Sequence, residues 1–401
     1  MKTIKVLLTE AIHTIAKEQL ESSGFEVTHL SHAPDETELL ELAPRYQIIG
    51  IRSKTNLPEI FFNKNRHLLA IGAFCIGTNQ IDLESANKNG IPVFNAPYSN
   101  TRSVAELVLA EIIALSRQLG DRNIGAHKGE WIKSAVGSRE VRGKTLGIIG
   151  YGHIGTQLSI LAEALGLKVV FYDVFKKLPL GNALALSSLE DLLLQSDFVS
   201  LHVPETPQTK DMIGEVELKQ MKKGSYLINA SRGSVVVIDA LAKSLKDKHL
   251  MGAAIDVFPI EPSSNKEKFI SPLQGIPNVI LTPHIGGSTE EAQFNIGLEV
   301  AQSLTQFINN GSTTGAVNFP SVDLPIHKSC RRIINVHRNE PGVLSEINSV
   351  ISKEGANILG QYLATDPNIG YLVIDFEKAE TNRVASEISR LPRSISTRIV
   401  L

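Results

Sequence analysis

Three charged side chains stand just past apolar segments that are typical of buried strands. Arg232 follows LINAS, Glu261 lies in DVFPIEP, and His284 follows NVILTP. If these segments are neighbouring parallel strands, the three side chains meet at the carboxyl edge of one sheet, where ligands of open α/β sheets bind. Each residue taken singly is equally typical of a surface loop, so the set is a hypothesis at this point.

The chemistry available to this set is the oxidation of a hydroxy acid. A guanidinium such as that of Arg232 forms paired hydrogen bonds with a carboxylate. The imidazole of His284 is suited to accept a hydroxyl proton as a hydride leaves the neighbouring carbon. The carboxylate of Glu261 is suited to orient that imidazole and to stabilise its charged form.

A glycine-rich turn supplies the expected hydride acceptor. TLGIIGYGHIG places Gly150, Gly152 and Gly155 in a G-x-G-x-x-G array after an apolar run, and Asp173 closes the next run, KVVFYD. This arrangement is typical of a dinucleotide-binding turn, in which the pyrophosphate lies at a helix N-terminus. Because a carboxylate at the position of Asp173 repels a 2′-phosphate, we expect NAD rather than NADP.

The composition argues against several other classes of protein. The chain has 401 residues and a formal net charge of −2, with no basic stripe for nucleic acid. The N-terminal apolar run is short for a signal peptide and no segment approaches membrane-spanning length, so we expect a cytoplasmic protein. Cys75 and Cys330 are the two cysteines, expected to be buried thiols that form neither a disulfide nor a metal site.

The elements that must position these groups alternate between strand-like and helical segments. The alternation predicts two doubly wound parallel-sheet domains of Rossmann-like or flavodoxin-like type. Long helices are expected at Ser103–Leu119 and Thr289–Asn309. The β-α-β-β-α-β order after the linker predicts a ferredoxin-like α+β domain. The expected boundaries are 1–99 with 294–318 for a substrate domain, 100–293 for an NAD-binding domain, 319–328 for a linker and 329–401 for the small domain.

From Ile4 to Phe319 these motifs resemble the NAD-dependent D-isomer-specific 2-hydroxyacid dehydrogenases. The resemblance implies that Arg232, Glu261 and His284 are catalytic, with His284 as the acid and base, and that Asp256 lies near the nicotinamide. It implies that the cofactor is bound by Gly150, Gly152, His153, Ile154, Gly155, Asp173, Ala230, Ser231, Arg232, Asp256, His284, Ile285, Gly286 and Gly287.

The chain is most similar to family members that carry one C-terminal regulatory ACT domain. GIRSKT, FCIGTNQID and APYSNTRSVAE resemble their substrate loops, which implies that Arg52, Ser53 and Asn100 contact the substrate. Arg52 is then a candidate for binding a phosphate group. Lys133 and Arg139 are candidates for reaching the active site of a neighbouring subunit, and an ordinary solvated loop is the open alternative.

In the C-terminal domain, NVHRNEPGVL and EGANILGQYLAT are similar to serine-binding segments of this family. The similarity implies that His337, Asn339 and Asn357 bind L-serine between two paired domains of a homotetramer. Arg338 departs from the glutamate that is usual between that histidine and asparagine. A simple dimerisation module is the alternative.

The resemblance implies oxidation of 3-phospho-D-glycerate to 3-phosphooxypyruvate with NAD, the first step of L-serine biosynthesis, under feedback inhibition by L-serine. No membrane, nucleic-acid or metal partner is expected. One alternative is an NADH-dependent reductase of another 2-oxo acid, such as 2-oxoglutarate, hydroxypyruvate or glyoxylate. The other is an NAD-sensing interaction protein without enzymatic activity.

Overall fold

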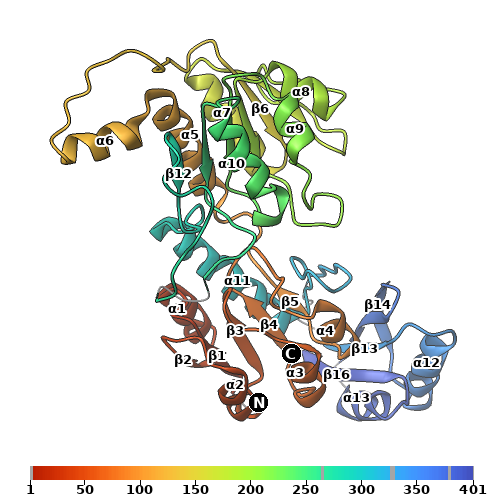
Figure 1. The fold of residues 1–401 in the computed structure, drawn as a ribbon. Helices are drawn as coiled ribbons and strands as arrows, with labels where there is room; N and C mark the ends of the chain where they lie inside the picture. Colours follow the sequence, from red (N-terminus) through yellow and green to blue (C-terminus); the bar gives the residue numbers. More distant parts are fainter. Residues whose placement is uncertain (1–2, 263–265, 326–329, 378–380, 401) are drawn as a thin grey trace. The chain divides into compact units, whose positions relative to one another are not determined.

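The computed structural model describes residues 3–262, 266–325, 330–377 and 381–400. The chain divides into two compact units, one made of Met1–Ser99 with Gln293–Leu401 and the other of Asn100–Ala292. The first unit contains two sheets and the second contains one (Figure 1). Each unit is described by itself below.

The first sheet of the first unit is parallel and has the strand order β2-β1-β3-β4-β5. This is the flavodoxin-like order, in which helices cover both faces of the sheet. Its strands are β1 Lys5–Leu8, β2 Glu26–His29, β3 Ile48–Ile51, β4 Ala70–Ala73 and β5 Val93–Phe94. Its helices are α1 Thr14–Ser22, α2 Glu36–Leu42, α3 Glu59–Lys64, α4 Leu83–Lys88 and α11 Glu290–Asn310, with a 3₁₀ turn at Ala43–Arg45.

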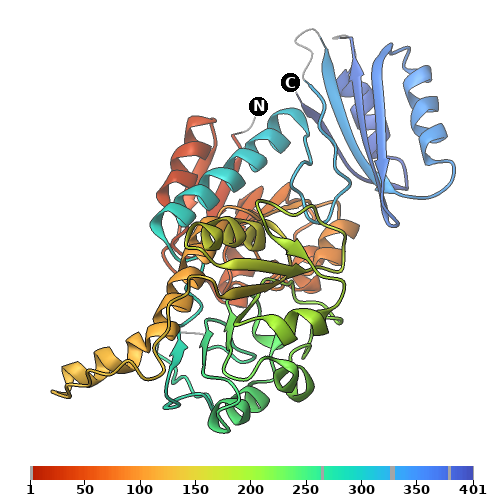
Figure 2. The same ribbon diagram turned by 90° about the horizontal axis from the view of Figure 1, so that it is seen from above.

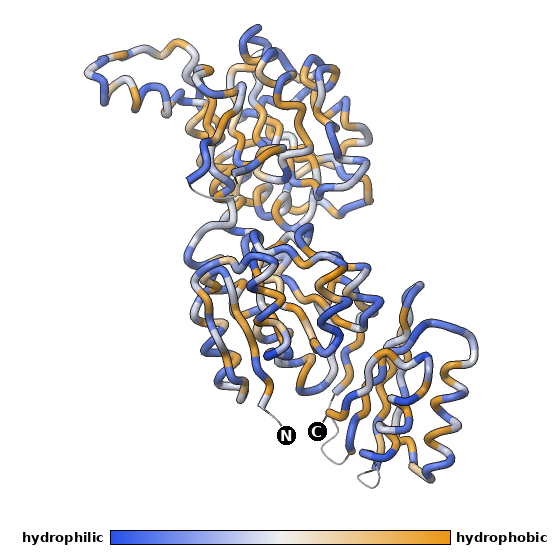
Figure 3. The backbone as a smooth tube through the Cα atoms, turned by 60° about the horizontal axis from the view of Figure 1, so that its bottom comes forward, coloured by the Kyte–Doolittle hydropathy of each residue, from blue (hydrophilic) through white to orange (hydrophobic). Residues whose placement is uncertain are grey.

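Apolar residues on the two faces of this sheet form two separate cores. Helices α1 and α11 pack on one face around Leu8 and Phe74. Helices α2, α3 and α4 pack on the other face around Leu7 and Ile49. Because both faces are covered, the central strands β3 and β4 are apolar and buried along their whole length. Figure 3 shows the hydropathy along the backbone.

The second unit holds a parallel sheet of order β12-β11-β10-β9-β6-β7-β8. Counted from β6, this is the Rossmann order with one more strand at an edge. The order in which strands are added to the sheet reverses between β6 and β9, which are neighbours. The strands are β6 Thr145–Ile149, β7 Lys168–Tyr172, β8 Leu184–Ala185, β9 Phe198–Leu201, β10 Tyr226–Asn229, β11 Gly252–Ile255 and β12 Val279–Leu281. The helices are α5 Thr101–Arg117, α6 Leu119–His127, α7 His153–Ala164, α8 Leu189–Gln195, α9 Glu215–Gln220 and α10 Ile238–Lys246, with a 3₁₀ turn at Gly233–Val235. Helices α5 and α7 cover one face and α8, α9 and α10 the other.

The C-terminal part of the first unit is an antiparallel sheet of order β14-β15-β13-β16. Its elements are β13 Arg331–Arg338, α12 Val343–Lys353, β14 Ile358–Thr365, β15 Ile369–Phe376, α13 Thr381–Ser389 and β16 Ser394–Val400. Both helices pack on one face of the sheet, and Figure 2 shows α12 and the sheet side by side. The opposite face carries Ile334, Val336 and Tyr371, which belong to the same core as α11.

Three side chains of this small domain hold the C-terminal end of α11. The guanidinium of Arg398 donates to the carbonyls of Phe307 and Ile308 at 2.5 and 3.0 Å. Arg332 donates to Asn310 O at 2.9 Å, and the hydroxyl of Tyr371 donates to Gly311 O at 2.6 Å. The last carbonyls of a helix lack partners within the helix, so these bonds satisfy them and offset the negative end of its dipole.

The predicted fold class is confirmed in each sheet and in the β-α-β-β-α-β order of the small domain. The two long helices are α5 and α11, each displaced by one or two residues from the prediction. The predicted linker is not a free spacer, since Phe319 and Val322 are buried in a core with Tyr371. Its residues 326–328 lie outside the described part of the chain.

The prediction that both cysteines are buried is wrong. Cys75 and Cys330 are of intermediate exposure, and neither is in a disulfide. Both stand at strand ends, Cys75 just after β4 and Cys330 just before β13, where the sheet no longer encloses the side chain. Within the described residues, no helix is both long enough and apolar enough to cross a membrane.

Candidate active site

His284 and Glu261 form a direct hydrogen bond between two loops at the carboxyl edge of the Rossmann sheet. Nδ1 of His284 lies 2.8 Å from Oε2 of Glu261. The other carboxylate oxygen of Glu261 accepts the N–H of Phe258 at 3.1 Å, which fixes the carboxylate in its own loop. Because an ionised carboxylate only accepts, Nδ1 carries the proton, and Nε2 is the ring nitrogen left for proton exchange.

The electrostatics of this pair favour the charged form of both groups. The hydrogen bond that His284 donates to Glu261 raises the pKa of His284, against the opposing effect of burial. Burial alone would raise the pKa of Glu261, but its bonds to His284 and to the Phe258 amide, with the charge of Arg232, lower it below its usual value. The imidazole is therefore a stronger base than a free one, and its carboxylate partner stays ionised.

Arg232 joins this pair through a close contact between two backbones. It precedes a 3₁₀ turn whose first residue, Gly233, lies so near Phe258 that a Cβ there would collide with the Phe258 carbonyl. Glycine is therefore required for the Arg232 turn to pack on the loop that carries Glu261. The guanidinium is half-buried, and its Nη1 donates to Ser231 O at 2.7 Å.

Asp256 organises the loop that carries His284. Its buried carboxylate accepts the N–H groups of Ile285 and Gly286, each at 2.8 Å, and the hydroxyl of Thr282 at 2.6 Å. The backbone N–H of His284 donates to Asp256 O at 2.8 Å, and His284 itself has a left-handed φ of 55°. These bonds hold a non-glycine residue in a conformation that it rarely adopts, which points to a constrained site.

A buried carboxyl group, Glu111, lies behind Asp256 on α5. Burial, together with the charge of Asp256, raises the pKa of Glu111 to about 8. Neither of its side-chain oxygens has a hydrogen-bond partner among the described residues. Glu111 is therefore protonated at neutral pH, so it places no charge beside Asp256.

The glycine turn fits a dinucleotide. Gly150 has a φ of 92°, and a Cβ there would lie 2.6 Å from His202 O. A Cβ at Gly155 would collide with Gly150 O, whereas one at Gly152 would meet nothing within 4 Å. Gly150 and Gly155 are thus needed for the turn itself, and Gly152 leaves open space at the first turn of α7, which has no side-chain cap. His153 and Ile154 begin that helix and present its N–H groups.

Asp173 lies at the end of β7, as the cofactor prediction requires, and it also supports the glycine turn. Its Oδ2 accepts the N–H of Tyr151 at 2.9 Å, and its Oδ1 accepts the N–H of Phe175 at 2.9 Å. Each carboxylate oxygen can accept a second hydrogen bond, so these contacts leave capacity for ribose hydroxyls. Ala230 and Ser231 follow β10, where Asn229 Oδ1 holds the N–H and the hydroxyl of Ser231.

The three predicted substrate residues are divided between the two units. Arg52 and Ser53 follow β3 in the first unit, with Arg52 half-buried and Ser53 exposed. Asn100 begins the second unit as the residue that precedes α5, and its side-chain oxygen is buried with no partner among the described residues. Asn100 lies against the loop that carries Gly287, because a Cβ at Gly287 would lie 2.5 Å from Asn100 Nδ2. A buried side-chain oxygen without a partner is typical of a ligand contact.

The three predicted serine-binding residues do not meet within one chain. His337 is buried and its Nδ1 pairs with Asn335 Oδ1 at 2.9 Å, while Asn339 lies just past the end of β13. Asn357 precedes β14, whose first residue is level with Phe376, as Arg331 is. Asn357 and Asn339 thus lie at opposite ends of the sheet, roughly 25 Å apart at about 3.3 Å per strand residue. A shared effector site would need a second copy of this domain.

Lys133 and Arg139 are exposed, and Arg139 Nη1 lies 3.5 Å from Gly224 O of its own domain.

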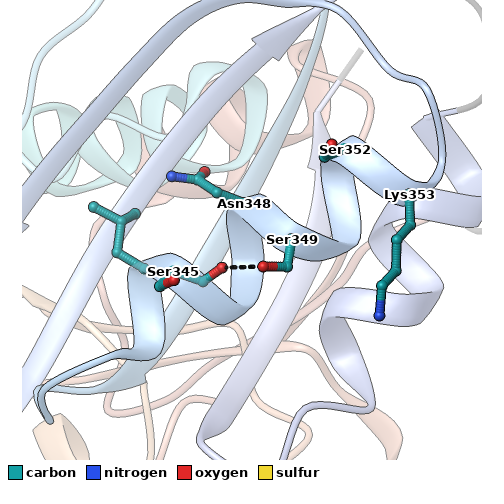
Figure 4. A pocket seen from close by; sticks show the side chains of 6 residues that line it. Ser345, Asn348, Ser349, Ser352 and Lys353 are labelled. Atoms are coloured by element: carbon teal, nitrogen blue, oxygen red, sulfur yellow. Dashed lines mark hydrogen bonds between the residues drawn. The ribbon is translucent and has the colours of Figure 1, made fainter.

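A shallow pocket on α12 is lined by Ser345, Asn348, Ser349 and Lys353 (Figure 4). Within the described residues, no group of three or more histidine, cysteine or acidic side chains is arranged to hold a metal.

Two family models match this chain. The model described as "D-isomer specific 2-hydroxyacid dehydrogenase, NAD binding domain" matches residues 109–286, and the "AHAS small subunit-like ACT domain" model matches residues 333–396. The fold and the site are those of an NAD-dependent dehydrogenase of 2-hydroxy acids with a C-terminal ACT domain.

Similar proteins extend the match to the whole chain. The D-3-phosphoglycerate dehydrogenase of Escherichia coli (strain K12) is 54% identical over 400 residues, which cover 99% of this chain and 97% of that protein. The enzyme of the same name from Dictyostelium discoideum is 51% identical over 397 residues, covering 99% of this chain and 97% of that protein. The chain therefore belongs to the D-isomer specific 2-hydroxyacid dehydrogenase family, in the group of D-3-phosphoglycerate dehydrogenases.

A solved structure shows the same architecture with its cofactor. The D-lactate dehydrogenase from Aquifex aeolicus, complexed with NAD and lactic acid, is 30% identical, with a TM-score of 0.69, and covers 79% of this chain and 100% of that protein. NAD is the cofactor of this chain, as predicted.

Sequence reasoning missed three residues that the structure places in or beside the candidate sites. Glu111 stands on the apolar face of the predicted helix, and a single acid among apolar residues is a signal that the sequence alone contains. Glu10 lies just after β1, and Gln80 lies in the segment that follows β4. Both contact the backbone of Arg52 in the loop that follows β3. Nothing in their local sequence indicates those contacts.

Proposed function

We propose that this enzyme oxidises 3-phospho-D-glycerate to 3-phosphooxypyruvate, the first step of L-serine biosynthesis. The observation that carries the proposal is the hydrogen-bonded His284–Glu261 pair beside Arg232, in a chain related over its full length to D-3-phosphoglycerate dehydrogenases. These groups match the needs of the reaction, which are a base for the hydroxyl and a cation for the carboxylate.

In this proposal Arg232 binds the substrate carboxylate and holds the C2 carbon in place, while Nε2 of His284 takes the hydroxyl proton. The raised pKa of His284 and the ionised Glu261 stabilise the imidazolium that forms. NAD supplies the acceptor for the hydride that leaves C2. The glycine turn, Asp173, Ala230–Arg232, Asp256 and the 284–287 loop would hold that cofactor.

The phosphate group of the substrate is assigned to Arg52, with Ser53 and Asn100 as further contacts. Arg52 is the first cation of a loop at the carboxyl edge of the first sheet, where ligands of such sheets bind, and the exposed Lys54 is the second. Among the alternative substrates, glyoxylate and hydroxypyruvate carry no phosphate, and 2-oxoglutarate would place a carboxylate on the same cation.

L-Serine is proposed as the feedback inhibitor, bound by His337 and Asn339 of one ACT domain and Asn357 of another. The separation of these residues within one chain supports a site shared by two copies. Burial lowers the pKa of His337, so its ring would enter the site uncharged. Arg338, where glutamate is usual, adds a positive charge next to that site.

We further propose a homo-oligomer, a tetramer by family resemblance. The segment from α6 to Arg139 exposes Trp131, Ile132 and Val136, with 89, 60 and 82% of each residue accessible. Arg122 donates to the carbonyls of Ile132 and Ser134, each at 2.9 Å, and so shapes this segment before any partner binds. Such an apolar surface is typical of a subunit contact. A cytoplasmic location is proposed because NAD is available there and cysteines stay reduced, in keeping with two cysteines that form no disulfide.

The test is an assay of NADH formation with a panel of 2-hydroxy acids that includes 3-phospho-D-glycerate, D-glycerate, D-lactate and 2-hydroxyglutarate. The proposal expects the highest kcat/KM with 3-phospho-D-glycerate. A higher value with an unphosphorylated acid would assign the chain to another reaction, and NAD binding without turnover of any acid would favour an NAD-sensing protein.

A further inference from the structure

The backbone of Arg52 is held on both sides by side chains from neighbouring strand ends. Its N–H donates to Oε1 of Glu10 at 2.9 Å, and its carbonyl accepts from Nε2 of Gln80 at 2.7 Å. The N–H groups of Lys54 and Thr55 also donate to the Glu10 carboxylate, at 3.0 and 2.9 Å. One carboxylate therefore binds three N–H groups of a four-residue loop.

Glu10 is suited to this task because it is buried and its own backbone is fixed. Only 8% of the residue is exposed, and a buried carboxylate is costly unless it is fully hydrogen-bonded. Glu10 and Ala11 have left-handed φ angles of 58° and 48°, and their N–H groups donate to His32 O and Leu30 O. This turn directs the carboxylate from the end of β1 toward the loop after β3.

The strand order explains why Gln80 reaches the same loop. β3 lies between β1 and β4, so the segments that follow β1 and β4 flank the loop that follows β3. Gln80 also lies 3.4 Å from Sγ of Cys75 and 3.5 Å from Gly77 O, which ties it to its own loop. The Arg52 loop is thus fixed by one acceptor and one donor on opposite sides.

These contacts determine what the loop can offer to a substrate. The N–H groups of Arg52, Lys54 and Thr55 are used by Glu10, so they are not free to bind an anion. What remains is the N–H of Ser53 and three side chains: that of Arg52, whose Nη1 is 3.4 Å from Glu10 O, and the exposed ones of Ser53 and Lys54.

We propose that Glu10 and Gln80 are positioning residues that hold the Arg52 loop in the shape that binds the substrate's anionic end. The proposal rests on the proposed function for the assignment of Arg52 to the substrate phosphate. Glu10 and Gln80 act through the loop backbone, and neither is assigned a contact with the substrate.

The first experiment compares Glu10→Ala, Glu10→Gln and Gln80→Ala with wild type. Hydrogen bonds to a charged group are strong enough that Glu10→Ala should raise KM for 3-phospho-D-glycerate about 10- to 100-fold. Values of kcat and of Kd for NADH should stay within about twofold. Glu10→Gln keeps an acceptor for two of the three N–H groups, so its KM should lie between those of wild type and Glu10→Ala. Glu59→Gln, an exposed acid at the start of α3, is the matched control and should leave KM unchanged.

The second experiment repeats Glu10→Ala in an Arg52→Ala background. If Glu10 acts through Arg52, its substitution there should change KM by less than about twofold, because coupled residues give non-additive effects. Equal fold-changes in both backgrounds would overturn the proposal, and so would a Glu10→Ala protein whose kcat falls while KM stays constant.

A third readout does not depend on activity. Amide hydrogen exchange of Arg52, Lys54 and Thr55 should be slow in wild type and at least about tenfold faster in Glu10→Ala, with exchange in α7 unchanged. Unchanged exchange would reject the role of Glu10 even if the enzyme oxidises 3-phospho-D-glycerate. If exchange is faster in Glu10→Ala but the wild-type enzyme oxidises some other hydroxy acid, the role of Glu10 in holding the Arg52 loop is supported and the proposed substrate is rejected.

Discussion

Oε2 of Glu261 accepts a hydrogen bond from Nδ1 of His284 at 2.8 Å, and this contact sets the acid–base behaviour of the site. It is the first cause of the raised pKa of His284. Oxidation of a hydroxy acid needs the neutral imidazole, and reduction of an oxo acid needs the imidazolium. The pH limbs of the two directions therefore report the same titration.

Glu261→Gln should move both limbs to lower pH. The neutral amide removes the negative partner, so the pKa of His284 falls and the neutral ring persists to lower pH. The acid limb of kcat/KM for oxidation and the alkaline limb for reduction should shift together. The plateau rate should fall by about 10- to 100-fold because the imidazolium loses its stabilising charge. A pH profile with unchanged limbs would show that Glu261 does not control the titration of His284.

Glu111→Gln should change how stability depends on pH. The folded-state pKa of Glu111, about 8, lies above the usual 4.5 of a glutamate, so the folded state binds this proton more tightly than the unfolded state. That contribution is fully present below about pH 4.5 and is lost as pH rises toward 8, on the order of 5 kcal/mol in total. Thermal unfolding at pH 5 and pH 9 should show a smaller loss of Tm in Glu111→Gln than in wild type. Equal losses would contradict the assignment of a protonated Glu111.

Asp173→Ala should erode the preference for NAD over NADP. The substitution removes the charge that repels a 2′-phosphate, so kcat/KM with NADP should rise relative to that with NAD. The Tyr151 and Phe175 amides also lose their acceptor, so KM for NAD itself should increase. An unchanged ratio of the two kcat/KM values would place cofactor discrimination elsewhere.

Asn87→Ala should weaken serine inhibition without weakening serine binding. Asn87 Nδ2 donates to Asp366 Oδ2 at 2.7 Å, and the carbonyl of Asp366 accepts from Asn339 at 2.7 Å, which links a proposed serine ligand to α4. If inhibition uses this contact, residual activity at saturating serine should rise several-fold, within a coupling of about 1–3 kcal/mol.

Calorimetry should give the same serine affinity for Asn87→Ala within about twofold. Asn89→Ala, at the end of the same helix, is the control. Undiminished inhibition in Asn87→Ala would remove this contact from the coupling, and serine-insensitive wild type would reject the effector site altogether.

The parts of this molecule that sequence reasoning predicted are those set by local pattern. The alternation of apolar strands and helices and the spacing of Gly150, Gly152 and Gly155 predicted the fold class and the cofactor, because each depends on neighbours along the chain. The break between α5 and α6 was not anticipated. It occurs at Gln118, which adopts a left-handed φ of 52° without being glycine.

The contacts that sequence reasoning missed are set by strand order. Glu10, Arg52 and Gln80 meet because β1, β3 and β4 are adjacent, and no spacing along the chain indicates that adjacency. Glu111 was readable as an acid on an apolar face, but its proximity to Asp256 depends on the packing of α5 against the Rossmann sheet. The roles of Arg232, Glu261 and His284 stay predictions, which the structure supports by placing them in one site.

The most direct test of the central claim is the oxidation of 3-phospho-D-glycerate by His284→Asn, followed as NADH formation together with NADH binding. Asparagine keeps a polar side chain of similar reach but cannot accept the hydroxyl proton. The account predicts that kcat falls by about 10²- to 10⁴-fold while Kd for NADH stays within about twofold. Normal turnover in this variant would contradict the assignment of His284 as the acid–base group, and with it the proposed chemistry of the site.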